Sequence, residues 1–270
     1  TNTKAYELYL KAKHTYDKRT DTNDTEKARG LLRQAIELDD SLITAKVQLG
    51  NTYSDMGDYD EAMEIYTPAL EQAEKLADKL GMGAALNNIG VVYWNKGEYD
   101  TALEYYDRSL KIREEIGDKR GKGQVLNNIG LVHDYKGEYD TALDYYDRSL
   151  AIDEELGNKR GMGDTLNNIG IVHADKGEYD KALEYYDRSL KIKEELGNKA
   201  GMGQVLNNIG LVYWNKGEYD TALEYYNRSL KIREEIGDTR GMGDTLGNIG
   251  IVNSNRGEYD TALEYYERSL

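Results

Sequence analysis

Residues 126–150 read LNNIGLVHDYKGEYDTALDYYDRSL, and this stretch returns with few changes at intervals of 40 residues. LNNIG begins at Leu86, Leu126, Leu166 and Leu206, and KGEYD begins at Lys96, Lys136, Lys176 and Lys216. A fixed period of this length indicates stacked copies of one small structural unit rather than separate globular domains. The 270 residues are therefore expected to form one continuous repeat array.

Each unit contains two segments with the apolar spacing of an α-helix. Residues 120–136 carry Val125, Leu126, Ile129 and Val132 at helical intervals, and residues 138–156 carry a second apolar stripe. Gly137 lies between the segments, where a left-handed residue commonly ends a helix. No segment alternates with a period of two, so the sequence predicts an all-α fold of antiparallel helix pairs.

The period also predicts where the units begin and end. We expect about seven helix pairs, of which the first is divergent and the last is truncated. The expected boundaries are 1–40, 41–80, 81–120, 121–160, 161–200, 201–240 and 241–270.

The small and large residues of each unit resemble the tetratricopeptide repeat family. The matching positions in the unit that starts at Gly123 are Leu126, Ile129, Gly130, Gly137, Tyr139, Ala142, Tyr146, Ser149 and Leu150. A period of 40 rather than about 34 is similar to the longer repeats of kinesin light chains, of the Leu-Gly-Asn adaptor family and of bacterial signalling regulators. The resemblance implies a right-handed superhelix whose concave groove binds protein or peptide partners.

Composition narrows the range of functions. The net charge of −15 disfavours phosphate backbones and anionic membrane surfaces, so neither nucleic acid nor membrane is expected as a partner. The chain has no cysteine and no cluster of nucleophile, base or metal ligands at a useful spacing. We therefore expect no enzyme activity and no cofactor, and we expect a cytoplasmic location.

By the family register, polar and aromatic residues of the first helix in each unit face the groove. The predicted peptide-binding residues are Asn87, Asn88, Trp94, Asn127, Asn128, Asp134, Tyr135, Asn167, Asn168, Asp175, Asn207, Asn208, Trp214 and Asn248. A carboxamide both donates and accepts hydrogen bonds, so a row of Asn side chains can pair with a peptide backbone at regular steps. The same Asn columns can instead tie adjacent helices together, and the sequence leaves both interpretations open.

Charge indicates the kind of peptide. The groove columns contain Asp134, Asp164, Asp175 and Asp244 but no Lys or Arg. The cationic part of the carboxylate-binding site found in chaperone-binding repeats is therefore unmatched in these columns. A neutral or basic peptide is expected rather than an acidic C-terminal tail.

Two other functions compete with peptide binding. Truncation at Leu270, without a polar capping helix, favours end-to-end self-association. Similarity of the first unit to repeats that follow cyclase or kinase domains favours a regulatory region of a larger signalling enzyme.

Overall fold

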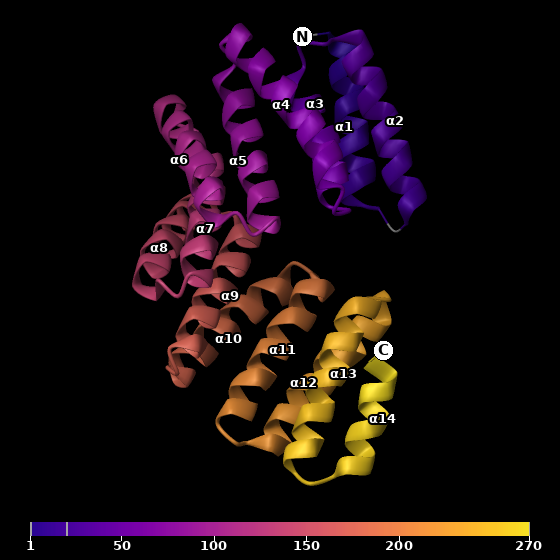
Figure 1. Ribbon diagram of the computed structural model, residues 1–270, viewed down its shortest axis with the longest axis vertical. Helices are drawn as coiled ribbons and strands as arrows, with labels where there is room; N and C mark the ends of the chain where they lie inside the picture. The colour runs from indigo at the N-terminus through magenta and orange to yellow at the C-terminus, as the bar shows by residue number, and fades with distance from the viewer. Residues whose placement is uncertain (1, 20, 270) are drawn as a thin grey trace. The chain divides into compact units, whose positions relative to one another are not determined.

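The computed structural model describes residues 2–19 and 21–269, and these residues form helices joined by turns, without a strand (Figure 1). The all-α prediction is confirmed. The helices are α1 (Thr3–Asp17), α2 (Thr22–Leu38), α3 (Ile43–Ser54), α4 (Tyr59–Leu76), α5 (Lys79–Asn95), α6 (Tyr99–Ile116), α7 (Lys119–Tyr135), α8 (Tyr139–Leu156), α9 (Lys159–Asp175), α10 (Tyr179–Glu195), α11 (Lys199–Asn215), α12 (Tyr219–Ile236), α13 (Thr239–Asn255) and α14 (Tyr259–Ser269).

The helices gather into two compact units. Unit 1 comprises Thr1–Val132, and unit 2 comprises His133–Leu270. In each unit an odd-numbered helix packs against the even-numbered helix that follows it, as α5 does with α6 and α11 with α12. Successive odd-numbered helices also touch, as α3 does with α5 and α11 with α13. The odd-numbered helices therefore form one layer within each unit.

The repeated sequence specifies its own helix ends. Asp78, Asn158, Asn198 and Asp238 precede odd-numbered helices, and each side chain accepts a hydrogen bond from the backbone N–H three residues later. This bond satisfies one of the N–H groups that a helix start leaves unpaired. Gly137, two residues after the last residue of α7, has a φ of +73°, in the left-handed region that a side chain disfavours. The turn before α8 is therefore fixed locally, as the sequence predicts.

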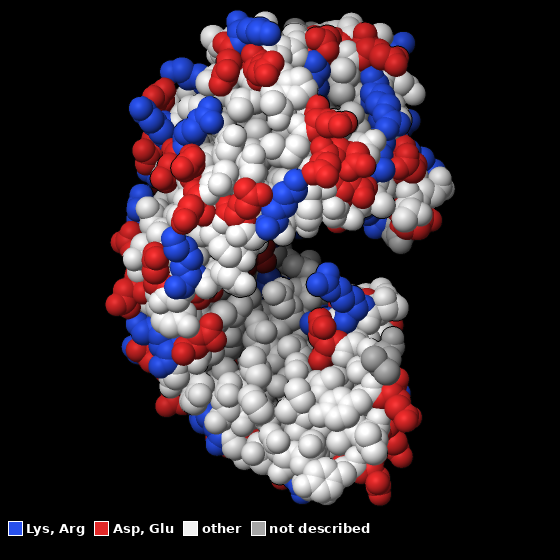
Figure 2. All heavy atoms as spheres, in the orientation of Figure 1, with Lys and Arg blue, Asp and Glu red and all other residues white. Residues whose placement is uncertain are grey.

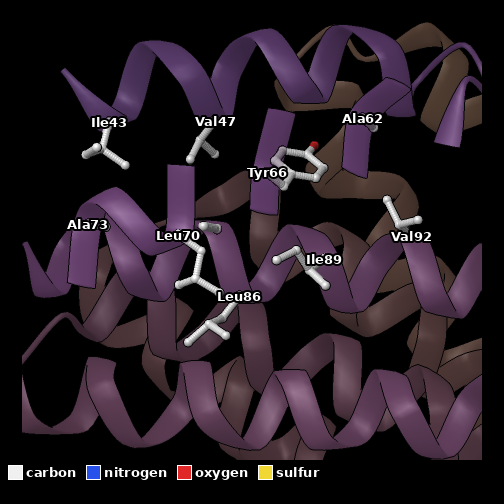
Figure 3. Close-up of a cluster of buried hydrophobic side chains, with 10 residues drawn as sticks. Ile43, Val47, Ala62, Tyr66, Leu70, Ala73, Leu86, Ile89 and Val92 are labelled. Atoms are coloured by element: carbon white, nitrogen blue, oxygen red, sulfur yellow. The ribbon is translucent and has the colours of Figure 1, made fainter. Parts of the chain in front are cut away.

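The core lies between the layers and repeats along the chain. Figure 3 shows one cluster in unit 1, in which Tyr66 and Leu70 of α4 pack between α3 and α5. Gly90 permits a close approach of the next tyrosine, because a Cβ there would lie 2.6 Å from the Tyr106 ring. Gly210 does the same for Tyr226 in unit 2, at 2.7 Å. The Gly and Tyr columns are thus matched by shape.

The KGEYD motif links consecutive repeats at the surface. The Lys176 ammonium lies 2.7 Å from the Asp140 carboxylate, and Lys216 lies 3.3 Å from Asp180. In unit 1, Lys96 lies 2.7 Å from Asp60. The lysine of one copy therefore pairs with an aspartate of the copy before it. These exposed ion pairs contribute little to the free energy of unfolding.

Candidate functional site

The predicted Asn columns meet in pairs on the odd-numbered helices. In unit 1, Asn88 Nδ2 donates to Asn51 Oδ1 at 2.7 Å, and Asn128 Nδ2 donates to Asn87 Oδ1 at 3.0 Å. We call each such pair an Asn rung. The rungs tie adjacent helices together, which is one of the two interpretations that the sequence left open.

Unit 2 repeats the arrangement with the same geometry. Asn208 Nδ2 donates to Asn167 Oδ1, and Asn248 Nδ2 donates to Asn207 Oδ1, both at 3.0 Å. Asn127 and Asn168 hold the equivalent sequence positions in α7 and α9, and both are half-buried. A carboxamide has two N–H donors and an oxygen with two lone pairs, so one bond does not exhaust it. A rung is therefore compatible with a further contact on its exposed side.

A pocket of about 450 Å³ opens on this layer in unit 1. It is lined by Tyr9, Lys13, Thr44, Val47, Gln48, Asn51, Ala84, Asn87, Asn88, Arg113, Gln124 and Asn128. Four odd-numbered helices contribute to it, and amide side chains dominate the lining. Its volume is in the range of ligand-binding pockets. The pocket gathers three of the predicted site residues, namely Asn87, Asn88 and Asn128.

Two basic side chains enter this pocket from outside the predicted columns. Lys13 comes from α1 and is exposed, and it forms no ion pair with a residue that the structure describes. Arg113 comes from α6, where it is buried, bonds to Ser109 Oγ at 3.3 Å and pairs with Asp118. The predicted groove columns contain no Lys or Arg, as the sequence indicates. The folded pocket of unit 1 nevertheless contains one residue of each type.

Arg113 belongs to a column of buried charges that the sequence pattern did not reveal. Asp153, Lys193 and Arg233 hold the same position in later copies, and each is buried. Gly121 makes room for it, since a Cβ there would overlap the Arg113 guanidinium, and Gly241 does the same for Arg233. The recurring Gly-x-Gly at the start of odd-numbered helices was the available signal. The glycines of this Gly-x-Gly allow the helices to pack around a buried charged side chain.

The predicted aromatic anchors differ in how open they are. Tyr135 is 66% exposed. Trp94 is half-buried, and its ring centroid lies 5.1 Å from that of Tyr99. Trp214 is half-buried against the core of α12 and α13, and its indole N–H has no acceptor among the described residues. Tyr135 is therefore the most accessible of the three.

Unit 2 carries the predicted acidic residues Asp134 and Asp175. Burial raises the pKa of Asp134 to about 6, and the nearby charge of Asp175 adds to the effect. Partial desolvation raises the pKa of Asp175 as well. Figure 2 shows that the visible surface over α11 and α12 is largely uncharged, whereas acidic and basic side chains intermingle over α1–α4. Desolvation is therefore the main cause of both raised pKa values.

Histidines near the site have structural partners. His173 stacks on Tyr185 with ring centroids 5.3 Å apart, and its Nδ1 lies 2.7 Å from Glu178. His133 repeats this arrangement with Tyr145 and Glu138. Within the described residues, no three His, Asp or Glu side chains gather closely enough to hold a metal ion.

Comparison with known proteins shows to which family the chain belongs. The sequence profile of the tetratricopeptide repeat family matches residues 41–115, 81–155, 122–195, 161–235 and 201–270. The chain belongs to the tetratricopeptide repeat family. No curated protein matches it by sequence. None of the helices in the described part of the chain is long and apolar enough to cross a membrane.

Solved structures share the repeat fold at low identity. BtubC (BKLC) from P. vanneervenii is 22% identical with a TM-score of 0.65, over 87% of this chain and 93% of that one. A STAND protein with a tetratricopeptide repeat sensor from Pyrococcus horikoshii is 18% identical with a TM-score of 0.74, over 98% of this chain and 42% of that one. A Rap protein in complex with competence and sporulation factor is 17% identical with a TM-score of 0.75, over 98% and 74%. These likenesses support the solenoid of helix pairs.

Proposed function

We propose that this repeat protein binds an extended, neutral or basic peptide, or an extended segment of a partner protein, along the layer of odd-numbered helices. The observation that carries the proposal is the amide-lined pocket of unit 1, into which α3, α5 and α7 each place at least one Asn or Gln. A peptide backbone offers one donor and one acceptor per residue, and carboxamides match both. The Asn rungs hold these carboxamides at a regular spacing before a ligand arrives.

Pre-organisation favours binding over a purely structural role for the rungs. A side chain that is already fixed loses little conformational entropy when a ligand pairs with it. Asn88 and Asn128 are each half-buried, so the rung covers only part of each amide. Asn167 is more deeply buried, at 3% exposure, and is therefore the least suited to contact a peptide.

A peptide-display screen tests the proposal. The parent chain and Asn128→Ala/Asn168→Ala/Asn208→Ala are screened against one random library, after circular dichroism has shown equal helical content. We expect enriched peptides on the parent and a loss of enrichment on the variant. Glu104→Ala/Glu184→Ala/Glu224→Ala is the matched control, because these exposed residues lie on even-numbered helices. Equal enrichment on all three proteins would contradict the proposal.

A regulatory role within a larger signalling protein is a second candidate. It is supported by the likeness to the STAND protein with a tetratricopeptide repeat sensor, of which this chain covers 42%. Such a sensor would still bind a ligand on the odd-numbered helices, so the display screen applies to both candidates. Sedimentation at increasing protein concentration tests the separate prediction of end-to-end self-association, because a pure peptide binder keeps a constant mass.

A further inference from the structure

One face of each odd-numbered helix lines the pocket of unit 1. On α3 the lining residues follow the i, i+3, i+4, i+7 spacing of a helix face, and they are Thr44, Val47, Gln48 and Asn51. On α1, which lies beside α3 (Figure 1), the pocket is lined by Tyr9 and Lys13. These two residues fit the i+3 and i+7 positions of the same pattern, so Tyr6 and Leu10 complete the α1 face.

The α1 face is apolar at positions where later helices carry amides. Leu10 stands where α3 has Gln48 and α5 has Asn88. Tyr9 and Val47 stand where each odd-numbered helix from α5 to α11 has Asn. Those four helices form over their whole length with Asn at this position. The apolar residues of α1 and α3 are therefore a local addition that the repeat does not require.

These apolar side chains are partly open to solvent beside the pocket. Tyr6 is 46% exposed, and Leu10 is 47% exposed. The rings of Tyr6 and Tyr9 are in contact, with their centroids 5.7 Å apart, and Tyr9 and Val47 both line the pocket. Leu10 lies one turn from Tyr6 on the same side of α1. We call Tyr6, Tyr9, Leu10 and Val47 the apolar patch.

The apolar patch is anchored in the core of unit 1. Tyr9 packs against the buried cluster that includes Leu32 of α2 and Leu49 of α3, and Val47 belongs to the buried cluster that α3, α4 and α5 share. A surface that is already fixed loses little conformational entropy when a ligand covers it. Removal of its exposed apolar area from water then favours binding.

The charges beside the apolar patch disfavour a basic side chain. None of the described residues that line the pocket is acidic. Lys13 lies one turn from Leu10 on the same face of α1, and Arg113 already bonds to Ser109 and pairs with Asp118. Lys13 is thus the one exposed cation among the lining residues, and a single exposed charge attracts an acid only weakly. A neutral, apolar group fits this end of the pocket best.

We infer that the apolar patch binds one large apolar side chain, Leu, Met or Phe, of the bound peptide. The inference rests on the proposed function and adds to it the place and the chemical class of one anchor residue. Gln48 and Asn51 line the pocket beside Val47, so the peptide groups that flank the anchor meet amide donors and acceptors. Apolar anchors supply much of the binding free energy at such sites, and polar groups fix the orientation.

A second copy of the chain is a competing occupant of the apolar patch. A stable interface between two proteins involves about 20–30 residues on each side. The apolar patch has four residues, of which Val47 is only 5% exposed. This area falls short of a dimer interface but suits a single side chain. Self-association therefore becomes an outcome of the test.

The test uses the whole chain and defined peptides. Methyl groups of Leu and Val are labelled with 13C and followed by NMR during addition of capped Gly-Ser-Gly-X-Gly-Ser-Gly, in which X is Leu, Gly, Glu or Lys. We expect the Leu10 and Val47 signals to shift together, with an affinity for the Leu peptide at least about fivefold above that for the other three. Leu211 of α11, which is 41% exposed, is the internal control for non-specific apolar contact.

A double variant separates binding from folding. Tyr6→Thr/Leu10→Gln installs the residues that α3 has at these exposed positions, so helical content by circular dichroism should be unchanged. We expect its affinity for the Leu peptide to fall to that of the Gly peptide. Leu76→Gln is the matched control, because Leu76 is 51% exposed but lies on the even-numbered helix α4. It should bind the Leu peptide as the parent does.

Each result separates the anchor from the proposed function. Equal affinity for the Leu and Gly peptides, stronger binding of the Glu peptide, or equal shifts at Leu211 would overturn the anchor. A lower sedimenting mass of the double variant than of the parent would also overturn it, because the patch would then join copies of the chain.

The display screen decides the proposed function independently. Enriched peptides without a common apolar residue would overturn the anchor and leave the proposed function intact. Specific binding of the Leu peptide without any enriched long peptide would support the anchor and refute the extended peptide groove.

Discussion

The two units share one framework of helix pairs, but they differ in the charge of the side chains on their layer of odd-numbered helices. In unit 1 the pocket combines Asn rungs with Lys13 and Arg113, and none of the described residues that line it is acidic. In unit 2 the same Asn rungs continue, while Asp134 and Asp175 add uncompensated negative charge. Repetition therefore keeps the Asn rungs in both units, and a few substitutions between copies change the charge of the side chains around them.

The largest expected effect is a loss of unfolding free energy when the buried charge of Arg113 in unit 1 is removed. Arg113→Leu leaves the Asp118 carboxylate without its cation, and we expect a loss of about 2 kcal/mol of unfolding free energy, less than for a fully buried pair. Urea unfolding measures it. Lys193→Leu in unit 2 should cost about half as much, because its partner Asp164 is 53% exposed.

A double variant controls the interpretation of Arg113. Arg113→Leu/Asp118→Asn removes both charges, and Asn already serves as the helix cap at Asn158 and Asn198. We expect it to recover at least about half of the loss. A double variant no more stable than the single one would mean that Arg113 acts through packing rather than through charge.

Asp134 in unit 2, with Asp175 near it, should make the free energy of unfolding depend on pH. The folded-state pKa of Asp134 is about 6, above its ordinary value of 3.8, so the folded chain binds more protons between these two pH values. Its stabilising contribution is therefore complete below pH 3.8 and is lost as the pH rises through 6. The groups near Asp134 are Asp175 of α9, Tyr146 of α8 and Tyr186 of α10.

Asp134→Asn removes this dependence. After allowance for solvent screening of a half-buried group, it should stabilise the chain by about 1 kcal/mol at pH 7.5 and have little effect near pH 4. Thermal unfolding at both pH values checks the sign. Stabilisation that is larger at pH 4 than at pH 7.5 would refute the assignment.

The Asn rungs should contribute equally in the two units. Asn128→Ala in unit 1 and Asn208→Ala in unit 2 each remove one hydrogen bond of 3.0 Å that a half-buried amide donates. We expect each to cost about 0.5–1 kcal/mol in urea unfolding. A clear difference between them would show that the shared framework is not equivalent in the two units.

Local sequence signals predicted the framework well. The Asn or Asp before α5, α9, α11 and α13 and the left-handed Gly137 fix helix ends through neighbouring backbone atoms, so the helix pairs followed from the 40-residue period. The family register also identified Asn87, Asn88 and Asn128, which line the unit 1 pocket. These features depend on contacts within one repeat or on strict repetition of it.

The sequence alone determined the helical repeat, the family and the columns that share a face, because these depend on short-range periodicity. Only the tertiary structure decided how the columns meet. The rung from Asn128 to Asn87 and the ion pair between Lys193 and Asp164 cross between helices. Arg113 enters the pocket from an even-numbered helix, which no single-helix pattern indicates. Whether a polar side chain already has a partner depends on the distance between helices, and packing of the whole repeat sets that distance.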